Sequence, residues 1–169
     1  RFLPTIVVAN AFSDIKVPLN DATKTELPKM VNKGLQRLYS LQHSDGGWGW
    51  WENDQSNPYM TAYVIYGLSL AKKANYEINE SFYQKVINSF KKSEINDYTR
   101  SLLAITYKLI GDDNKALDEL AELKKNMKTT GEGAAYWEGK EFHYRWQDDK
   151  VQTTAMALRA ILLIDNKSE

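Results

Sequence analysis

Apolar side chains recur along most of this chain three and four residues apart, which is the spacing of an amphipathic helix. One stripe is made by Leu27, Met30, Val31, Gly34, Leu35, Leu38 and Leu41. Similar patterns predict helices over about 58–75, 82–90, 98–110 and 116–127. A last stripe contains Val151, Thr154, Ala155, Leu158, Ile161 and Leu162, and an apolar opening over residues 2–12 predicts one more helix. Because no segment alternates as a strand does, the sequence predicts an all-α fold.

Several residues indicate where these helices begin and end. Asn57 before Pro58 is a favourable cap and first position, since proline needs no hydrogen-bond partner for an amide there. Thr23 and Glu26 have the spacing of a capping box at the start of an earlier helix. Gly111 is predicted to end the helix over 98–110 in a left-handed conformation.

Two stretches of the chain repeat each other. The first, Gly46-Gly47-Trp48-Gly49-Trp50-Trp51, precedes a helix that carries Thr61-Ala62. The second, Gly133-Ala134-Ala135-Tyr136-Trp137, precedes a helix that carries Thr154-Ala155. Such self-similarity is typical of stacked helical hairpins, in which one hairpin cannot bury its apolar face alone. We therefore predict an α/α toroid, or part of one, over the single domain 1–169; an open superhelix of repeats is the structural alternative.

Composition narrows the function classes. The 169 residues are 43% hydrophobic, enough for a core, and 22 basic residues balance 22 acidic ones. A nucleic-acid partner is not expected without a basic excess, and no apolar run is long enough to span a bilayer. Cysteine is absent, so disulfides and thiolate metal sites are excluded within the chain. Since the chain starts abruptly at Arg1, we interpret it as a piece of a longer protein.

Candidate chemistry is sparse. Glycoside hydrolysis would need two carboxylates facing each other across a cleft, and the candidates by count are Glu132, Glu138, Glu141, Asp148 and Asp149. The Asp112-Asp113 pair reads better as a helix cap, and Asp148-Asp149 as a solvated turn. His43 and His143, without cysteine, are a weak basis for zinc. The sequence therefore predicts no catalytic residue, no metal site and no cofactor.

The tryptophans leave two interpretations open. Trp48, Trp50 and Trp51 could stack on a sugar, or they could close the end of a helical barrel. Gln42, Gly46 and Trp48 also have the spacing of a repeat found in terpene cyclases, but the Asp-x-Asp-Asp acid of those enzymes is missing. An α/α-barrel enzyme fragment (cyclase, lyase or glycosidase) and an aromatic carbohydrate-binding helical module remain the alternatives.

Four segments of the chain resemble a known family. Leu41-Gln42-His43-Ser44-Asp45-Gly46-Gly47-Trp48-Gly49-Trp50-Trp51, followed by Pro58-Tyr59-Met60-Thr61-Ala62-Tyr63-Val64, resembles bacterial alpha-2-macroglobulins. The likeness is to their thioester domain, an α/α toroid shared with complement proteins. Trp146-Gln147-Asp148-Asp149-Lys150-Val151-Gln152-Thr153-Thr154-Ala155 resembles a later loop and helix of that domain, and Arg1-Phe2-Leu3-Pro4 resembles the segment after the thioester motif.

The resemblance implies a protease-trapping inhibitor. In that family a Cys and a Gln of a Cys-x-Glu-Gln motif form an internal thioester, which acylates a protease after the protease cuts a bait region. The motif would lie just before Arg1, so this chain would be a structural part of the trap and not an enzyme. Its toroid would be incomplete at the C-terminal end. Proteases and neighbouring macroglobulin domains are the implied partners, and the implied location is extracytoplasmic, in the periplasm or anchored to the cell envelope.

The resemblance also suggests which residues cover the thioester. Trp48, Trp50, Tyr59 and Met60 are the candidates, because a thioester hydrolyses when water reaches it and large apolar side chains exclude water. Neither His43 nor His143 matches the histidine that assists transfer to hydroxyls in some complement proteins. Attack by amines is therefore the expected reaction of the intact parent.

Overall fold

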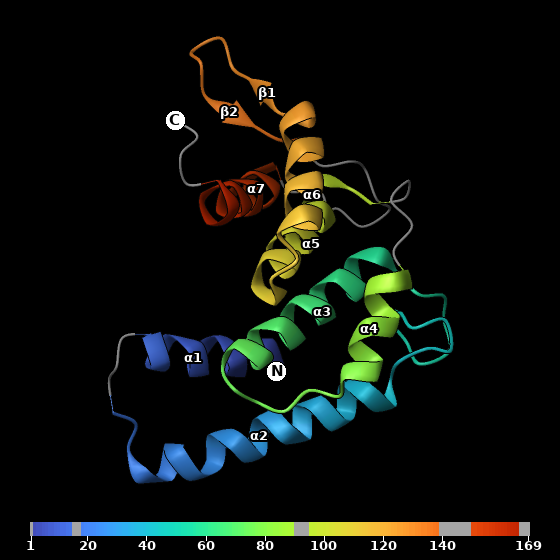
Figure 1. The fold of residues 1–169 in the computed structure, drawn as a ribbon, viewed down its shortest axis with the longest axis vertical. Helices are drawn as coiled ribbons and strands as arrows, with labels where there is room; N and C mark the ends of the chain where they lie inside the picture. Colours follow the sequence, from blue (N-terminus) through green and yellow to red (C-terminus); the bar gives the residue numbers. More distant parts are fainter. Residues whose placement is uncertain (1, 15–17, 90–94, 139–149, 166–169) are drawn as a thin grey trace. The chain divides into compact units, whose positions relative to one another are not determined.

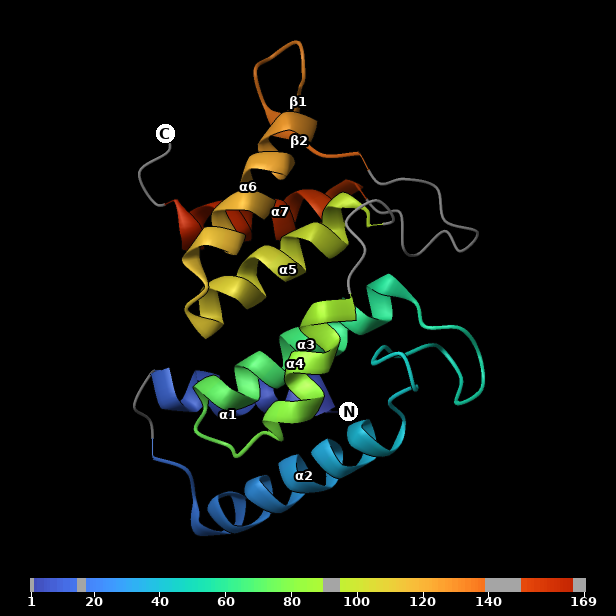
Figure 2. The ribbon, with the colours of Figure 1, turned by 45° about the vertical axis from the view of Figure 1, so that its right-hand side comes forward.

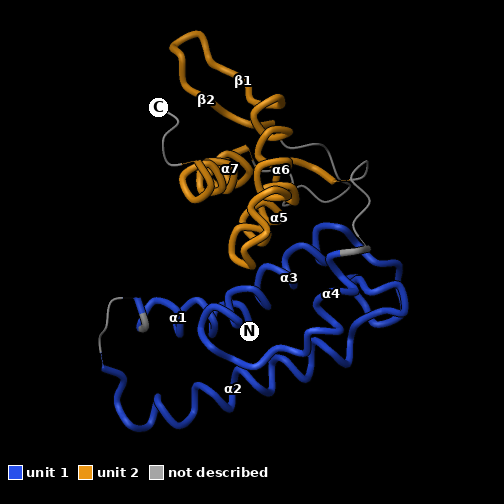
Figure 3. Tube along the Cα trace, viewed as in Figure 1, with its two compact units in different colours: residues 1–90 blue, residues 91–169 orange. Residues whose placement is uncertain are grey.

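The computed structural model describes residues 2–14, 18–89, 95–138 and 150–165, which form seven helices and one short hairpin (Figures 1 and 2). The all-α class predicted from the sequence is confirmed. The chain divides into two compact units, residues 1–90 and 91–169 (Figure 3). Closure of the helical hairpins into a single-domain toroid stays a prediction.

The first unit contains α1 (Phe2–Asp14), α2 (Asp21–Ser40), α3 (Pro58–Lys73) and α4 (Glu80–Ser89). Helix α3 is central: α1 packs against it and against α2, and α4 packs against it too. Its residues 61–71 are buried except Tyr63, so the helix is apolar around most of its circumference. The core of this unit includes Ile6, Leu27, Val31, Leu35, Ile65, Leu68, Tyr83 and Val86.

Helix α1 approaches α2 and α3 closely at two glycines. A Cβ atom on Gly34 would lie 2.7 Å from Cδ2 of Phe2, and one on Gly67 would lie 3.3 Å from Cε1 of the same ring. The Asn10 amide, further along α1, donates to the Leu70 carbonyl at 3.0 Å. Phe2 therefore lies beside Gly67. Helix α1 runs in the same general direction as α3 (Figure 1).

Two predicted helix ends are confirmed and one is wrong. The Asn57 side chain accepts from the Met60 amide with Pro58 as the first helical residue, and helix α5 (Asp97–Ile110) is capped by Gly111 with φ +84°. Helix α2 begins earlier than the capping-box spacing predicted, because Asn20 accepts from the Thr23 amide at 2.8 Å. Thr23 consequently lies in the first turn of α2 and is not its cap.

The second unit contains α5 (Asp97–Ile110), α6 (Asp113–Asn126), β1 (Lys128–Thr129), β2 (Ala135–Tyr136) and α7 (Lys150–Ile164). Helix α5 packs against both α6 and α7. The hairpin was not expected, and its two antiparallel strands pair Lys128 with Tyr136 and Thr129 with Ala135. Two-residue strands are too short to produce a detectable alternation, so the sequence pattern could not reveal them.

The predicted apolar stripe of α7 has the wrong phase. The buried residues are Thr153, Ala157 and Ala160, whereas Val151 is 75% exposed and Leu162 is 70% exposed. Small side chains let two helix backbones approach each other closely. Helix α5 packs as extensively against α7 as it does against α6. The larger apolar residues consequently lie on the outward side of α7 within this unit.

Candidate functional site

Trp48 ties together the two helices on either side of it. Its indole N–H donates to the Leu38 carbonyl in the last turn of α2, at 2.9 Å. Its backbone N–H donates to the Thr61 hydroxyl in the first turn of α3, at 3.0 Å, and that hydroxyl donates back to the Trp48 carbonyl at 3.2 Å. Trp48 is 3% exposed, so these bonds lie inside the unit. We call this arrangement the first tryptophan clamp.

Trp137 forms the same arrangement in the second unit. Its indole N–H donates to the Leu123 carbonyl of α6 at 2.7 Å, and its backbone N–H donates to the Thr154 hydroxyl of α7 at 3.1 Å. Trp137 is fully buried. The repeat read from the sequence is thus present in the contacts: each Thr-Ala helix is joined through its threonine to a tryptophan that holds the preceding helix. We call this the second tryptophan clamp.

Three aromatic rings form a row beside the first clamp. The ring planes of Trp50 and Tyr59 lie 16° apart with centroids 6.4 Å apart, and those of Tyr59 and Tyr63 lie 15° apart at 6.3 Å. Trp50 is 38% exposed, and partial burial raises the pKa of the Tyr63 phenol. This aromatic row, Trp50, Tyr59 and Tyr63, covers the N-terminal part of α3 with large and partly accessible rings.

Asp54 shapes the loop that presents the row. One oxygen of its carboxylate, Oδ2, accepts from the backbone N–H groups of Trp50 at 2.9 Å and Trp51 at 3.2 Å. A Cβ atom at position 49 would lie 1.8 Å from Oδ1 of Asp54, so any residue other than glycine there would displace this carboxylate. The loop between the clamp tryptophan and α3 therefore has a defined internal structure, although Trp51 itself is 78% exposed.

A second hydrogen-bonded group closes the base of the same loop. Asp45 accepts from the Gly47 amide at 2.9 Å and from the Ser56 hydroxyl at 2.7 Å. The bond from the Gly47 amide, followed by that from Ser56, lowers the pKa of the Asp45 carboxyl. The His43 ring lies against Ser56, with 3.0 Å between Nδ1 and Oγ. The loop is thus held at both ends by carboxylates.

The structure separates the four candidate shielding residues into two kinds. Trp48 lies in the core as part of the first clamp, whereas Trp50 and Tyr59 lie in the partly exposed row. Met60 is half-buried, and its backbone N–H donates to the Asn57 cap. Sequence reasoning missed Tyr63, which the four-residue helical spacing from Tyr59 could have revealed.

The carboxylates considered for catalysis do not form a facing pair where the structure describes them. Glu138 is ion-paired with Lys128 and, at 3.6 Å, with Lys150, while Glu132 is exposed. Glu141, His143, Asp148 and Asp149 lie outside the described residues. Asp112 caps α6 as predicted, accepting from the Lys115 amide. Among the described residues, no group of three potential metal ligands is found.

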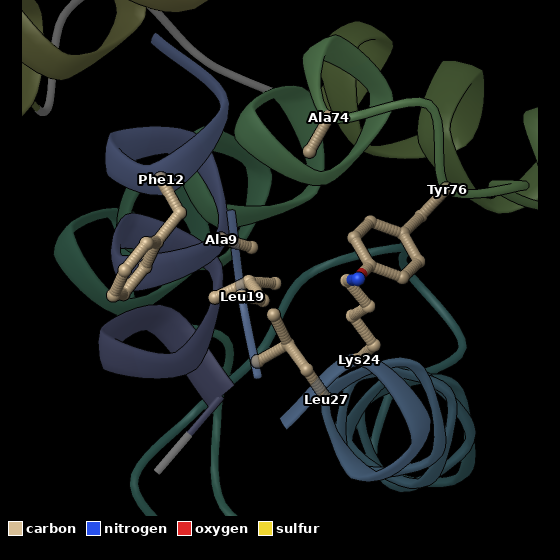
Figure 4. A pocket seen from close by; sticks show the side chains of 7 residues that line it. All are labelled: Ala9, Phe12, Leu19, Lys24, Leu27, Ala74 and Tyr76. Atoms are coloured by element: carbon tan, nitrogen blue, oxygen red, sulfur yellow. The ribbon is translucent and has the colours of Figure 1, made fainter. Parts of the chain in front are cut away.

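A separate cavity of about 290 Å³ lies among α1, α2 and the segment after α3 (Figure 4). Its lining is mostly apolar and consists of Ala9, Phe12, Leu19, Lys24, Leu27, Ala74 and Tyr76. Lys24 and Tyr76 are its polar side chains; the ammonium of Lys24 lies 3.6 Å from Asp21, and burial raises the pKa of the Tyr76 phenol. The lining offers no acid–base pair, so this cavity does not suggest catalysis.

Comparison with known proteins identifies the family of this chain. The model of the A-macroglobulin TED domain matches residues 1–90, the same span as the first unit. Alpha-2-macroglobulin from Thermotoga maritima is 33% identical over 118 residues, which is 69% of this chain and 7% of that protein. The chain is therefore a helical thioester-domain segment. It belongs to the alpha-2-macroglobulin family of bacteria, and it spans only a small part of the relative that it matches.

The comparisons also bear on the alternatives. They favour neither an α/α-barrel enzyme nor a carbohydrate-binding helical module, since the family match covers the aromatic loop itself. Within the described ranges, no helix combines the length and apolar character that a membrane crossing requires.

Proposed function

We propose that this domain belongs to an extracytoplasmic protease-trapping macroglobulin and that its first unit shields the internal thioester of that protein. In the proposal the chain is not an enzyme. The thioester is formed by a Cys-x-Glu-Gln motif preceding Arg1 in the parent, and it acylates an amine of a captured protease. Proteases and the other macroglobulin domains of the parent are the partners.

One observation carries the shielding role. Phe2, at the start of α1, packs beside Gly67 of α3, and Tyr63 lies one helical turn before Gly67 on the same helix. Because α1 runs in the same general direction as α3, a segment leading into α1 would approach along the part of α3 that carries Tyr63 and Tyr59. This direction supports the proposal that the aromatic row lies near the thioester, where its rings would exclude water.

The four candidate residues have different tasks in this proposal. Trp50 and Tyr59 supply ring surface, with near-parallel rings whose centroids lie 6.4 Å apart. Trp48 acts through its hydrogen bonds to Leu38 and Thr61, which fix the start of the loop. Met60 adds a flexible apolar side chain next to Tyr59. Trp50→Ala and Trp48→Ala should therefore both expose the thioester, the first directly and the second by loosening the loop.

The test uses the full-length parent and counts the thiol released when methylamine consumes the thioester before any protease is added. Trp50→Ala and Trp48→Ala should each speed thiol release by about tenfold, the effect of losing roughly one hydrogen bond or one stacked pair. Trp51→Ala is the matched control, because this indole is 78% exposed and stands outside the aromatic row. Its release rate should equal that of the unmodified parent.

Two results would contradict parts of the proposal. Equal release from the Trp50 and Trp51 variants, with the fold intact by circular dichroism, would make the row a packing feature only. If methylamine releases no thiol from the parent, the parent has no reactive thioester and this part of the proposal is wrong. Covalent protease adducts, seen as a mass increase in denaturing gels and lost after methylamine treatment, test the trapping role. Cell fractionation tests the extracytoplasmic location.

A further inference from the structure

The hydrogen bonds around His43 determine its protonation. The Ser56 hydroxyl has one proton to donate. Its oxygen lies 2.7 Å from Oδ1 of the Asp45 carboxylate, which can only accept a hydrogen bond. The ring atom Nδ1 of His43 lies 3.0 Å from the same hydroxyl oxygen. With the hydroxyl proton directed to Asp45, Nδ1 must carry a proton and donate it to Ser56.

The other side of the ring also faces acceptors. Nε2 of His43 lies 3.3 Å from the Trp51 carbonyl oxygen and 3.8 Å from Oδ1 of Asp54. This Asp54 oxygen is buried and has no hydrogen-bond donor among the described residues. A neutral ring has only one N–H, so either arrangement of its proton leaves a pair of acceptors facing each other. Only the doubly protonated ring satisfies every contact.

We infer that His43 is a pH-sensitive latch, whose protonated ring joins Ser56 at the base of the aromatic loop to Trp51 and Asp54 at its tip. Loss of the proton leaves Nε2 facing two acceptors or Ser56 facing Asp45 without a proton between them. The loop then loosens, and Trp50 and Trp51 become more mobile. The inference concerns this chain alone and does not depend on the proposed thioester.

The charged groups around the ring favour this arrangement. Asp45 and Asp54 are the carboxylates that face it, and Lys85 in α4 lies beside Gly46, where a Cβ atom would be 3.0 Å from its Cγ. His43 also follows the C-terminal end of α2, where the carbonyl dipoles favour a positive charge. The side chains of His43 and Asp54 are 12% and 29% exposed, so water screens the pair only in part.

The latch closes within a pH window. The lowered pKa of Asp45 means that its hydrogen bonds stabilise the loop at neutral pH and are lost only as the pH falls below about 3.8. A contribution that needs protonated His43 is lost when the ring releases its second proton as the pH rises. The loop is therefore held best in mildly acidic solution.

The experiment follows the ring and the loop together in the 169-residue chain. NMR of the imidazole nitrogens reports their protonation, and hydrogen exchange, corrected for its intrinsic pH dependence, reports the protection of the Trp50 and Trp51 amides. Both amides donate to Asp54. We expect their protection to fall about tenfold as the His43 ring titrates, which corresponds to one charge-assisted hydrogen bond.

Variants separate the latch from general loosening. In His43→Gln the protection of both amides should be low and independent of pH, and Ser56→Ala should weaken the pH dependence without removing the ring. His143→Gln keeps His43 and should behave as the unmodified chain does. Amides of α5 in the second unit serve as the folding control. Protection that ignores the titration of His43, or a pH dependence that survives His43→Gln, would overturn the latch.

Discussion

Replacing Thr61 by valine tests how much the first tryptophan clamp stabilises the fold. Valine has nearly the shape of threonine but lacks the hydroxyl, so packing is preserved while the two hydrogen bonds between Thr61 and Trp48 are removed. Thr61 is 3% exposed, and water cannot simply replace the lost group. The experiment therefore measures how much the Thr61 hydroxyl contributes to the free energy of unfolding.

The expected cost follows from which partner is left without a bond. The Trp48 carbonyl keeps a second donor, the Asn57 amide at 2.8 Å, so its loss is small. The Trp48 backbone N–H loses the acceptor that the structure gives it, and a buried donor left unpaired costs about 1–3 kcal/mol. We expect Thr61→Val to lower the free energy of unfolding by about 2 kcal/mol.

Urea denaturation followed by circular dichroism and tryptophan fluorescence measures this change. With a slope of about 2 kcal/mol per molar urea, the unfolding midpoint of the first unit should fall by about 1 M. Thr61→Ser retains the hydroxyl and loses one methyl group, which should cost about 1 kcal/mol. If Thr61→Ser destabilises the unit more than Thr61→Val does, the clamp contributes through packing and our reasoning is wrong. The same holds if Thr61→Val has the same urea midpoint as the unmodified chain.

Two further predictions concern the second unit. Arg100→Met should destabilise it by about 3 kcal/mol in denaturant, because Glu119, which is 3% exposed, would lose the Arg100 guanidinium that lies 2.6 Å from its carboxylate; adding Glu119→Leu should restore most of the loss. Burial, followed by the nearby charge of Glu119, raises the pKa of Tyr107 from 10.0 to about 12. A raised pKa means stability that is complete below pH 10.0 and is lost as the pH rises toward 12, so Tyr107→Phe should flatten the alkaline unfolding curve measured by circular dichroism.

The parts of the fold that the sequence predicted depend on local chemistry. Asn57, Pro58 and Gly111 each suit a backbone conformation that few other residues suit, and all three stand where they were expected. The repeated Gly/Trp and Thr-Ala motifs were recognisable because each clamp bonds residues close in sequence. Local chemistry also explains the cap of α6 at Asp112.

The parts that the sequence did not predict depend on packing partners. Helix α7 is apolar on more than one side, so its periodicity could not say whether Ala157 or Leu158 faces α5. Two possible caps, Asn20 and Thr23, preceded α2, and the spacing to Glu26 favoured the wrong one. At the candidate site, the aromatic nature of the loop was evident, but the burial of Trp48 and the contact between His43 and Ser56 require the folded loop.

In each tryptophan clamp, the segment between the tryptophan and the helix that follows it is a natural place for sequence insertion. Thr61 follows Trp48 by 13 residues, whereas Thr154 follows Trp137 by 17, yet the same bonds form at both. By loop-closure entropy the four extra residues cost only about 0.2 kcal/mol. New segments could therefore be grafted after Trp51 with both ends held in place. The pair of helices α2 and α3 would then serve as a scaffold for displayed peptides.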